Sequence, residues 1–142
     1  MPSSRAPSSE TLRRARLFWE QSQADLRSAR SLHRSRDYVH SSFLSLQAVT
    51  NGLSAVCHLH GHFQLPTGGP TQLLALCAQA DAQFASLELA HLERAMERNP
   101  FAPDEGQDPA PAFSQACLAE GEAVIESIQR YLKANKSRFF AP

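Results

Sequence analysis

The sequence predicts an all-α protein, an up-and-down bundle of about five helices. Apolar residues recur at three- and four-residue steps along most of the chain, which is the period of a helix face. Proline and glycine gather in a few short stretches that separate these periodic segments. No segment gives a convincing strand pattern. Short links between successive helices favour antiparallel packing, so an up-and-down bundle is the natural architecture.

The length and composition fit one globular domain. The chain has 142 residues, of which 42% are apolar and 20% are charged, and a chain of this size normally forms a single core. No apolar run is long enough to span a bilayer and no apolar leader follows Met1, so we expect a cytoplasmic protein. Three widely spaced cysteines without a CxxC motif fit buried, reduced thiols: Cys57, Cys77 and Cys117.

The first helix should begin near residue 10. Residues 1–9 are rich in serine and proline, and we expect them to be disordered. The bundle should occupy residues 10–137, followed by a C-terminal tail at 138–142. Ser8 or Ser9 can cap a helix that runs from about Glu10 to His33. Its apolar residues fall on one face: Leu12, Ala15, Trp19, Leu26, Ala29 and Leu32.

The second helix is expected from about Tyr38 to His60, with Asp37 as its N-cap. It has almost no charge and is apolar on two faces. Such a helix is buried, either at the middle of a bundle or in an interface between chains. If this helix lies in an interface between chains, the candidate dimer surface is formed by three of its residues: Phe43, Leu44 and Leu46.

Three further helices complete the prediction. Segment 61–69 contains glycines and a proline, which favour a turn. A short third helix is expected over Thr71–Ala80 and a fourth from about Ala82 to Arg98. A loop with four prolines at 99–111 then leads to the last helix, from about Ala112 to Lys136.

The charge sums to zero but is unevenly distributed. Eight arginines fall within the first 36 residues, whereas residues 37–92 contain no lysine or arginine. A basic helix face can attract phosphates. The alternative is a solvated face that Glu10, Glu20 and Asp25 partly balance. The arginines assigned to a ligand site, with a nucleotide as the ligand, are Arg27, Arg30, Arg34 and Arg98.

Two short motifs carry little chemical information. His58, His60 and His62 form an HxHxH triplet, but two-residue spacing suits a strand or loop, and no nearby Cys, Asp or Glu completes a metal shell. We assign no metal site and no cofactor. Gly68 and Gly69 precede a short helix, but they lack the Lys-Ser/Thr pair and the preceding strand of a phosphate-binding loop.

Four short motifs follow one another along the chain. They are Asp25-Leu26-x-x-Ala29, the break Arg36-Asp37-Tyr38, Phe43-x-x-x-Gln47-Ala48, and Arg98-Asn99-Pro100. In this order, over about residues 10–133, the chain resembles the HEPN superfamily of small all-α domains, whose members carry Arg-Tyr-Pro at the last of these positions. The resemblance implies a dimer. It also implies a setting, either beside a minimal nucleotidyltransferase in a toxin–antitoxin-like module or within a chaperone system linked to nucleotide binding.

The chain departs from the family at polar positions. After Gln47-Ala48 relatives commonly carry Glu-Lys and a further Lys, whereas this chain has Thr50, Asn51 and Ser54. The His-Asp-Leu that relatives often carry at the start of the third helix is Thr71-Gln72-Leu73 here. Neutral side chains at these positions favour packing, dimerisation or partner binding over catalysis. We therefore expect a non-enzymatic binding module.

The alternative prediction is an RNase toxin. Some HEPN proteins are metal-independent ribonucleases with an Arg-x4–6-His motif, and Arg34 and His40 have this spacing. A guanidinium can stabilise phosphate charge, and an imidazole can move protons near neutral pH. In the ribonuclease branches, however, the motif lies later in the domain than the junction of the first two helices.

Overall fold

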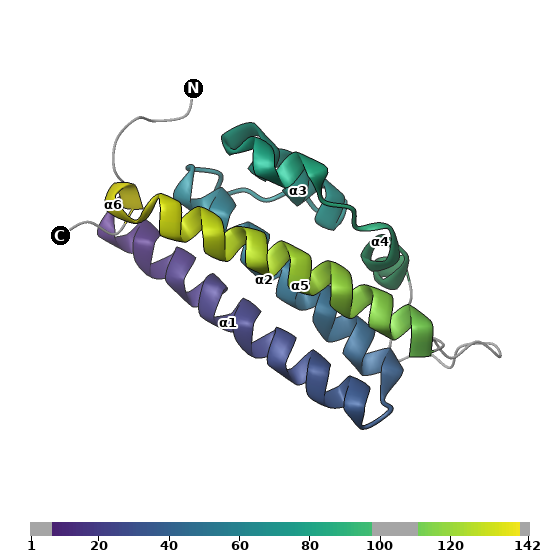
Figure 1. Cartoon of the computed structure of the whole chain (residues 1–142). Coiled ribbons are helices and arrows are strands. Elements are labelled where there is room, and N and C mark those ends of the chain that lie inside the picture. Colours follow the sequence, from purple (N-terminus) through teal and green to yellow (C-terminus); the bar gives the residue numbers. More distant parts are fainter. Residues whose placement is uncertain (1–6, 98–110, 140–142) are drawn as a thin grey trace.

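The protein is a helical bundle, which confirms the all-α prediction. The computed structural model describes residues 7–97 and 111–139, and no strand occurs within these ranges. Three long helices, α1, α2 and α5, form the body of the bundle, and shorter helices cover one side of it (Figure 1). The elements are α1 Ser9–Arg34, α2 Tyr38–Leu59, α3 Pro70–Ala80, the 3-10 helix η1 Ala82–Ser86, α4 Ala90–Glu97, α5 Pro111–Ala134 and α6 Lys136–Phe139.

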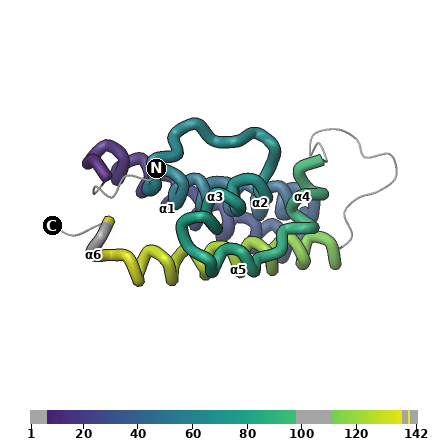
Figure 2. Tube along the Cα trace, turned by 90° about the horizontal axis from the view of Figure 1, so that it is seen from above, coloured from purple at the N-terminus to yellow at the C-terminus, as the bar shows by residue number. Residues whose placement is uncertain are grey.

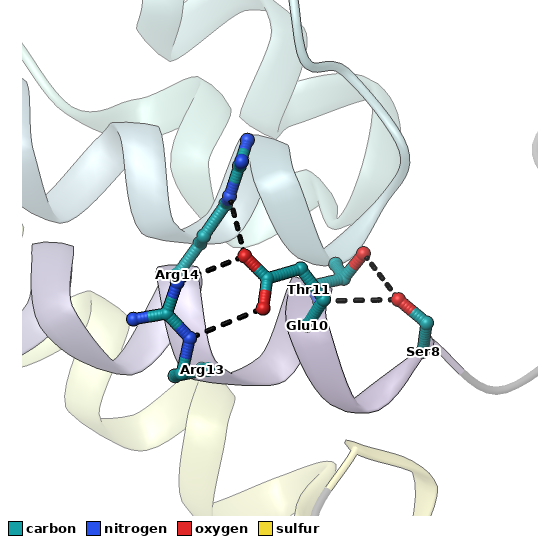
Figure 3. Close-up of polar contacts among 5 residues, drawn as sticks. All are labelled: Ser8, Glu10, Thr11, Arg13 and Arg14. Atoms are coloured by element: carbon teal, nitrogen blue, oxygen red, sulfur yellow. Dashed lines mark hydrogen bonds and ion pairs between the residues drawn. The ribbon is translucent and has the colours of Figure 1, made fainter.

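Local capping chemistry sets the start of α1. The Ser8 hydroxyl accepts a hydrogen bond from the Thr11 amide at 3.1 Å, as the sequence predicts. In the first turn Glu10 bonds Arg13 at 2.8 Å and Arg14 at 3.1 Å (Figure 3). These hydrogen bonds lower the pKa of the Glu10 carboxyl to about 2. Within the segment 1–9, which is predicted to be disordered, Ser8 is the N-cap of α1 and Ser9 is its first residue, whereas residues 1–6 lie outside the described ranges.

A tight reversal joins α1 to α2. Arg36 has a φ of 67°, in the left-handed region that turns the chain back after α1 ends. Asp37 then caps α2, because its carboxylate accepts a hydrogen bond from the His40 amide at 3.3 Å. The predicted break and the predicted N-cap of the second helix are both confirmed.

The α1–α2 pair is held closely by small residues. Ser22 donates a hydrogen bond to the Ala48 carbonyl at 2.6 Å, and Ser41 donates one to the Ala29 carbonyl at 2.7 Å. Gly52 lets α2 lie close to both neighbours, since an added Cβ would stand 2.9 Å from Ser22 Oγ of α1 and 2.8 Å from Ile128 Cδ1 of α5. Most residues of α2 are buried, as its two apolar faces predict.

The third long helix, α5, completes the core. It runs alongside α2 and in the opposite direction to α1 (Figure 1). The segment 61–69 returns the chain along the side of α1 and α2 that faces away from α5 (Figure 2). Fully buried side chains from α2, α5 and the short helices meet between them: Val49, Leu53, Val56, Phe84, Leu92, Val124, Ile128 and Tyr131.

The prediction of one fourth helix from about Ala82 to Arg98 is wrong. The segment forms η1 and α4, with an extended Leu87 (φ −80°, ψ 142°) between them. The cause is a cap from another helix: the Glu120 carboxylate of α5 accepts hydrogen bonds from the amides of His91 at 3.1 Å and Leu92 at 3.0 Å. This contact fixes the first turn of α4. The periodicity of apolar residues, taken alone, predicts a single helix through this point.

The C-terminal boundary also differs from the expectation. The expected tail at 138–142 begins inside α6, and Phe139 is buried. Its ring packs against His60 and Tyr131, with centroids 5.6 Å and 6.0 Å away. Burial of this large apolar side chain is favourable and holds α6 against the bundle.

The three cysteines are buried, as predicted. The sulfur atoms of Cys57 and Cys77 lie 3.8 Å apart, and each thiol also faces a backbone carbonyl. The contact with Cys57, together with burial, raises the pKa of the Cys77 thiol far above its ordinary value. These thiols therefore act as small packing residues.

Candidate functional site

The principal candidate site is a hollowed surface along α2, which we call the α2 face. One hollow of about 400 Å³ lies between α2, the segment 61–69, the start of α3 and α4. Gly69 borders it with a φ of 114°, and an added Cβ there would stand 2.8 Å from the Met96 sulfur. Its lining is mainly apolar and uncharged: Leu46, Gln47, Thr50, Asn51, Pro66, Thr67, Gly69, Pro70, Leu73 and Met96.

A second, more open hollow of about 490 Å³ adjoins the first, and Asn51 lines both. It lies between the first half of α1 and the second half of α2. Its residues are Arg14, Leu17, Phe18, Gln21, Asn51 and His58. Together the two hollows extend along most of α2.

An aromatic cluster forms one end of this face. The buried His58 ring packs between Phe18 at 4.9 Å and Phe63 at 5.6 Å, measured between ring centroids. Its Nδ1 donates a hydrogen bond to the Ser54 carbonyl at 3.0 Å, since a carbonyl can only accept. The imidazole is thus fixed in orientation by its own helix and by two aromatic rings.

A polar cluster lies at the middle of the face. Asp25 is 6% exposed, and its carboxylate accepts hydrogen bonds from Gln21 at 2.7 Å and Asn51 at 2.9 Å. Asn51 is one of the neutral residues by which the chain departs from the HEPN pattern. Here its amide joins α2 to α1 and satisfies a buried carboxylate, which would otherwise be costly to bury.

Large exposed apolar side chains gather on the same face. Within the described residues, the exposed large apolar side chains are Leu17 at 53%, Phe63 at 56% and Met96 at 44%. Leu17 and Met96 line the two hollows, and Phe63 packs on His58, which lines one of them. The apolar surface is therefore concentrated on the α2 face rather than scattered.

The residues predicted for a dimer interface lie partly inside the bundle. Leu46 is buried but lines the first hollow. Leu44 is half-buried and packs against the core, and Phe43 is also half-buried. Sequence periodicity correctly predicts that α2 is largely buried. The exposed part of the face, however, is built by Gln47, Thr50 and Asn51 and by neighbours from α1, 61–69 and α4.

The arginines predicted to bind a ligand form an exposed row on α1. Arg27, Arg30 and Arg34 are all exposed, and none of them lines the hollows of the α2 face. Arg30 pairs with Glu122 of α5 at 3.1 Å, with both side chains more than two-fifths exposed. An exposed pair of this kind contributes little to stability. Arg98 lies outside the described residues.

The residues of the alternative ribonuclease motif lie at the α1–α2 junction. Arg34 is the last residue of α1, and His40 is in the first turn of α2. Both are exposed, and the His40 Nδ1 lies 2.9 Å from the Asp37 carboxylate. Tyr38 packs against His33 at 5.3 Å between ring centroids.

The three histidines of the HxHxH triplet have separate surroundings. His58 belongs to the aromatic cluster of the α2 face, whereas His60 hydrogen-bonds the Tyr131 hydroxyl on α5. His62 is half-buried in the segment after α2. Within residues 7–97 and 111–139, no group of three or more His, Cys, Asp or Glu side chains is placed to hold a metal ion.

Sequence reasoning missed a third cavity of about 330 Å³, between the first half of α1 and the ends of α2 and α5. Trp19 appears in the sequence only as part of an apolar helix face. The cavity around Trp19 exists only in the folded chain. Because α5 runs antiparallel to α1, Lys133 and Lys136 lie beside Arg16 there. The full lining is Ala15, Arg16, Trp19, Ala55, Leu59, Leu132, Lys133 and Lys136.

The fold and these sites were compared with known proteins. Comparison of the chain with protein-family models, with curated proteins and with solved structures found no match. The resemblance to HEPN domains therefore stays a prediction. None of the helices in the described ranges is both long enough and apolar enough to cross a bilayer.

Proposed function

We propose that this chain is a non-enzymatic, HEPN-like binding module that acts by association through its α2 face, with a second copy of itself as the partner. One observation carries the proposal: the exposed apolar side chains lie at the α2 face, where Leu17 and Met96 line its two hollows and Phe63 packs on His58, which lines one of them. Monomeric proteins rarely expose large contiguous apolar patches, and such patches commonly mark interfaces.

The polar groups of the face suit association better than catalysis. Gln47, Thr50 and Asn51 offer amides and a hydroxyl, which form hydrogen bonds but do not exchange protons near neutral pH. His58, the one imidazole that lines the hollows, is held by the Ser54 carbonyl and two aromatic rings. General acid–base chemistry needs a group that can reach a substrate proton.

Charge favours a second copy as the occupant. A two-fold interface places the same patch against itself, so each end of the patch must complement the other. Arg14 lines the α1 end of the face, where Arg13 and Arg14 share the single carboxylate of Glu10, so this end keeps a net positive charge. At the other end α4 carries Glu93 and Glu97 against the single cation Arg94. A two-fold rotation brings the basic end of one copy to the acidic end of the other. The formal net charge of zero adds no long-range repulsion between copies.

The biological setting belongs to the same proposal. The HEPN resemblance favours a chain that works beside a minimal nucleotidyltransferase or within a chaperone system. A nucleotide is the ligand proposed for the row Arg27, Arg30 and Arg34, which is exposed along α1. Titration calorimetry with ATP and GTP tests this ligand. If millimolar nucleotide produces no heat of binding, the nucleotide is ruled out as the ligand. The proposed association through the α2 face is unaffected by that result.

Light scattering tests the association. The wild-type chain should elute with twice its 15.6 kDa mass. Leu17→Asp and Met96→Asp should each shift the mass to that of one chain, because a carboxylate would be buried in an apolar contact. Arg27→Asp is the matched control, since Arg27 is exposed on α1 but lines neither hollow.

Circular dichroism must show the same helix content in the wild type and the three variants. A lower mass in light scattering then reports loss of association and not unfolding. A wild-type chain that stays monomeric at concentrations on the order of 100 µM would overturn the proposal, because weaker association corresponds to a marginal interface.

A further inference from the structure

The third cavity is separate from the α2 face. It uses Ala15, Arg16 and Trp19 of α1, whereas the α2 face uses Arg14, Leu17, Phe18 and Gln21 of the same helix. At about 330 Å³ it reaches the size range of small-molecule sites. It lies between the first half of α1 and the C-terminal ends of α2 and α5, near α6.

The interior of this cavity is apolar. Its eight lining residues come from four helices, and the five uncharged ones lie on α1, α2 and α5: Ala15, Trp19, Ala55, Leu59 and Leu132. The indole N–H of Trp19 is the one polar side-chain group among these five. A nucleobase placed here would leave most of its donors and acceptors unpaired, which is unfavourable. An aliphatic chain has no such groups and gains free energy from burial.

The remaining lining residues are all cations. Arg16 comes from α1, Lys133 from the last turn of α5, and Lys136 from the start of α6. No carboxylate lines the cavity. Within residues 7–97 and 111–139, none of the three cations has a hydrogen bond or an ion pair to another side chain. Three converging positive charges at an apolar opening attract an anion.

We propose that this cavity binds an anionic amphiphile with a single medium-length acyl chain. The chain lies against Trp19, Leu59 and Leu132, and the carboxylate or phosphate headgroup lies among Arg16, Lys133 and Lys136. Lysine and arginine side chains can bury their aliphatic stems along the chain while their charged ends meet the headgroup. This site does not depend on association through the α2 face.

Trp19 provides a direct assay, because it is the only tryptophan of the chain and it lines the cavity. Decanoate, used below its micelle concentration, should change the intensity and wavelength of Trp19 emission with saturation. Each methylene added from hexanoate to decanoate should tighten binding about fourfold, because each buried CH₂ contributes a constant increment. Added salt should weaken binding, since the headgroup contact is ionic.

Charge variants test the headgroup site. The double variant Lys133→Gln/Lys136→Gln should bind decanoate at least tenfold more weakly. Arg130→Gln is the control and should bind as the wild type does, because Arg130 lies on the same helix as Lys133 but pairs with Glu126 and does not line the cavity. Trp19→Phe, followed by calorimetry, should retain binding, which shows that the emission change reports the cavity.

Three outcomes would overturn the proposal. Decanol binding as tightly as decanoate would show that the cations do not recognise a headgroup. ATP displacing decanoate at equal or lower concentration would assign the cavity to nucleotides. Binding to anionic vesicles without any binding of monomeric decanoate would assign the basic residues to a membrane surface. The thermal unfolding temperature of each variant must match that of the wild type. Weaker binding can then be assigned to the substituted side chains and not to partial unfolding.

Discussion

Glu120 on α5 holds His91 at the first turn of α4. Its carboxylate accepts a hydrogen bond from the His91 amide at 3.1 Å and lies 2.7 Å from the His91 Nδ1. The Glu120 side chain is 15% exposed, so this contact is largely shielded from water. One side chain thus caps a helix that contributes Met96 to the α2 face.

Removal of this cap should loosen α4. Glu120→Ala is expected to lower the free energy of unfolding by about 1–2 kcal/mol, because the amides of His91 and Leu92 lose their acceptor. Glu120→Gln should lose less, since its amide oxygen can still accept. Urea unfolding of both variants measures this difference. Glu122→Ala is the control on the same helix, and equal losses in the two alanine variants would contradict the capping role.

Two buried serines on α2 should respond in opposite directions to the same substitution. Ser41→Ala removes a hydroxyl that donates to the Ala29 carbonyl at 2.7 Å and should destabilise the protein by about 1 kcal/mol. The Ser45 hydroxyl is buried and has no hydrogen-bond partner within the described residues. Ser45→Ala should therefore be neutral or stabilising. Chemical denaturation compares the two, and a loss in Ser45→Ala as large as in Ser41→Ala would refute the assignment.

The pairing of Glu10 with Arg13 and Arg14 predicts a pH effect at the start of α1. Because the folded pKa is lowered from 4.5 to about 2, the contribution of the charged carboxylate is present above about pH 4.5. It is lost as the pH falls through 2. The NMR chemical shift of the Glu10 carboxyl carbon should therefore change with a midpoint near pH 2. The double variant Arg13→Gln/Arg14→Gln should raise this pKa towards 4.5, and an unchanged titration would show that the arginines do not cause the shift.

The ribonuclease alternative makes a separate prediction. Under the proposed function, purified protein leaves RNA intact with and without divalent metal. If cleavage occurs, His40→Ala and Arg34→Ala should abolish it, because the motif would supply both the proton-transfer and phosphate-binding groups. Arg36→Ala, at the same junction, is the control. Cleavage that depends on Arg34 and His40 but not on Arg36 would replace the binding module with an enzyme.

Local signals explain what the sequence could predict of the fold. Ser8 and Asp37 cap the helices that follow them, so their effect lies within three residues and can be read directly. The division of the expected fourth helix could not be read in this way, because its cause is Glu120 on another helix. Phe139 similarly packs on His60 and Tyr131, which are close only in the folded chain.

The candidate sites depend even more on tertiary packing. The lack of charge on α2 correctly marks this helix as central, and Leu46 does line a hollow of the face. Leu17 and Met96, which expose the apolar surface, lie on other helices and show no sequence signal of their own. Likewise, Trp19 meets Lys133 and Lys136 only because α5 runs antiparallel to α1.

The central claim, that two copies meet through the α2 face, is tested most directly by an intermolecular distance. A spin label at Gln47→Cys would lie on the face, and a label at Gln129→Cys would lie on the exposed side of α5. The native cysteines are buried and should not react. Pulsed dipolar spectroscopy should give a short distance between two Gln47 labels and a longer one between two Gln129 labels. No intermolecular signal from Gln47, or a shorter distance from Gln129, would contradict the account.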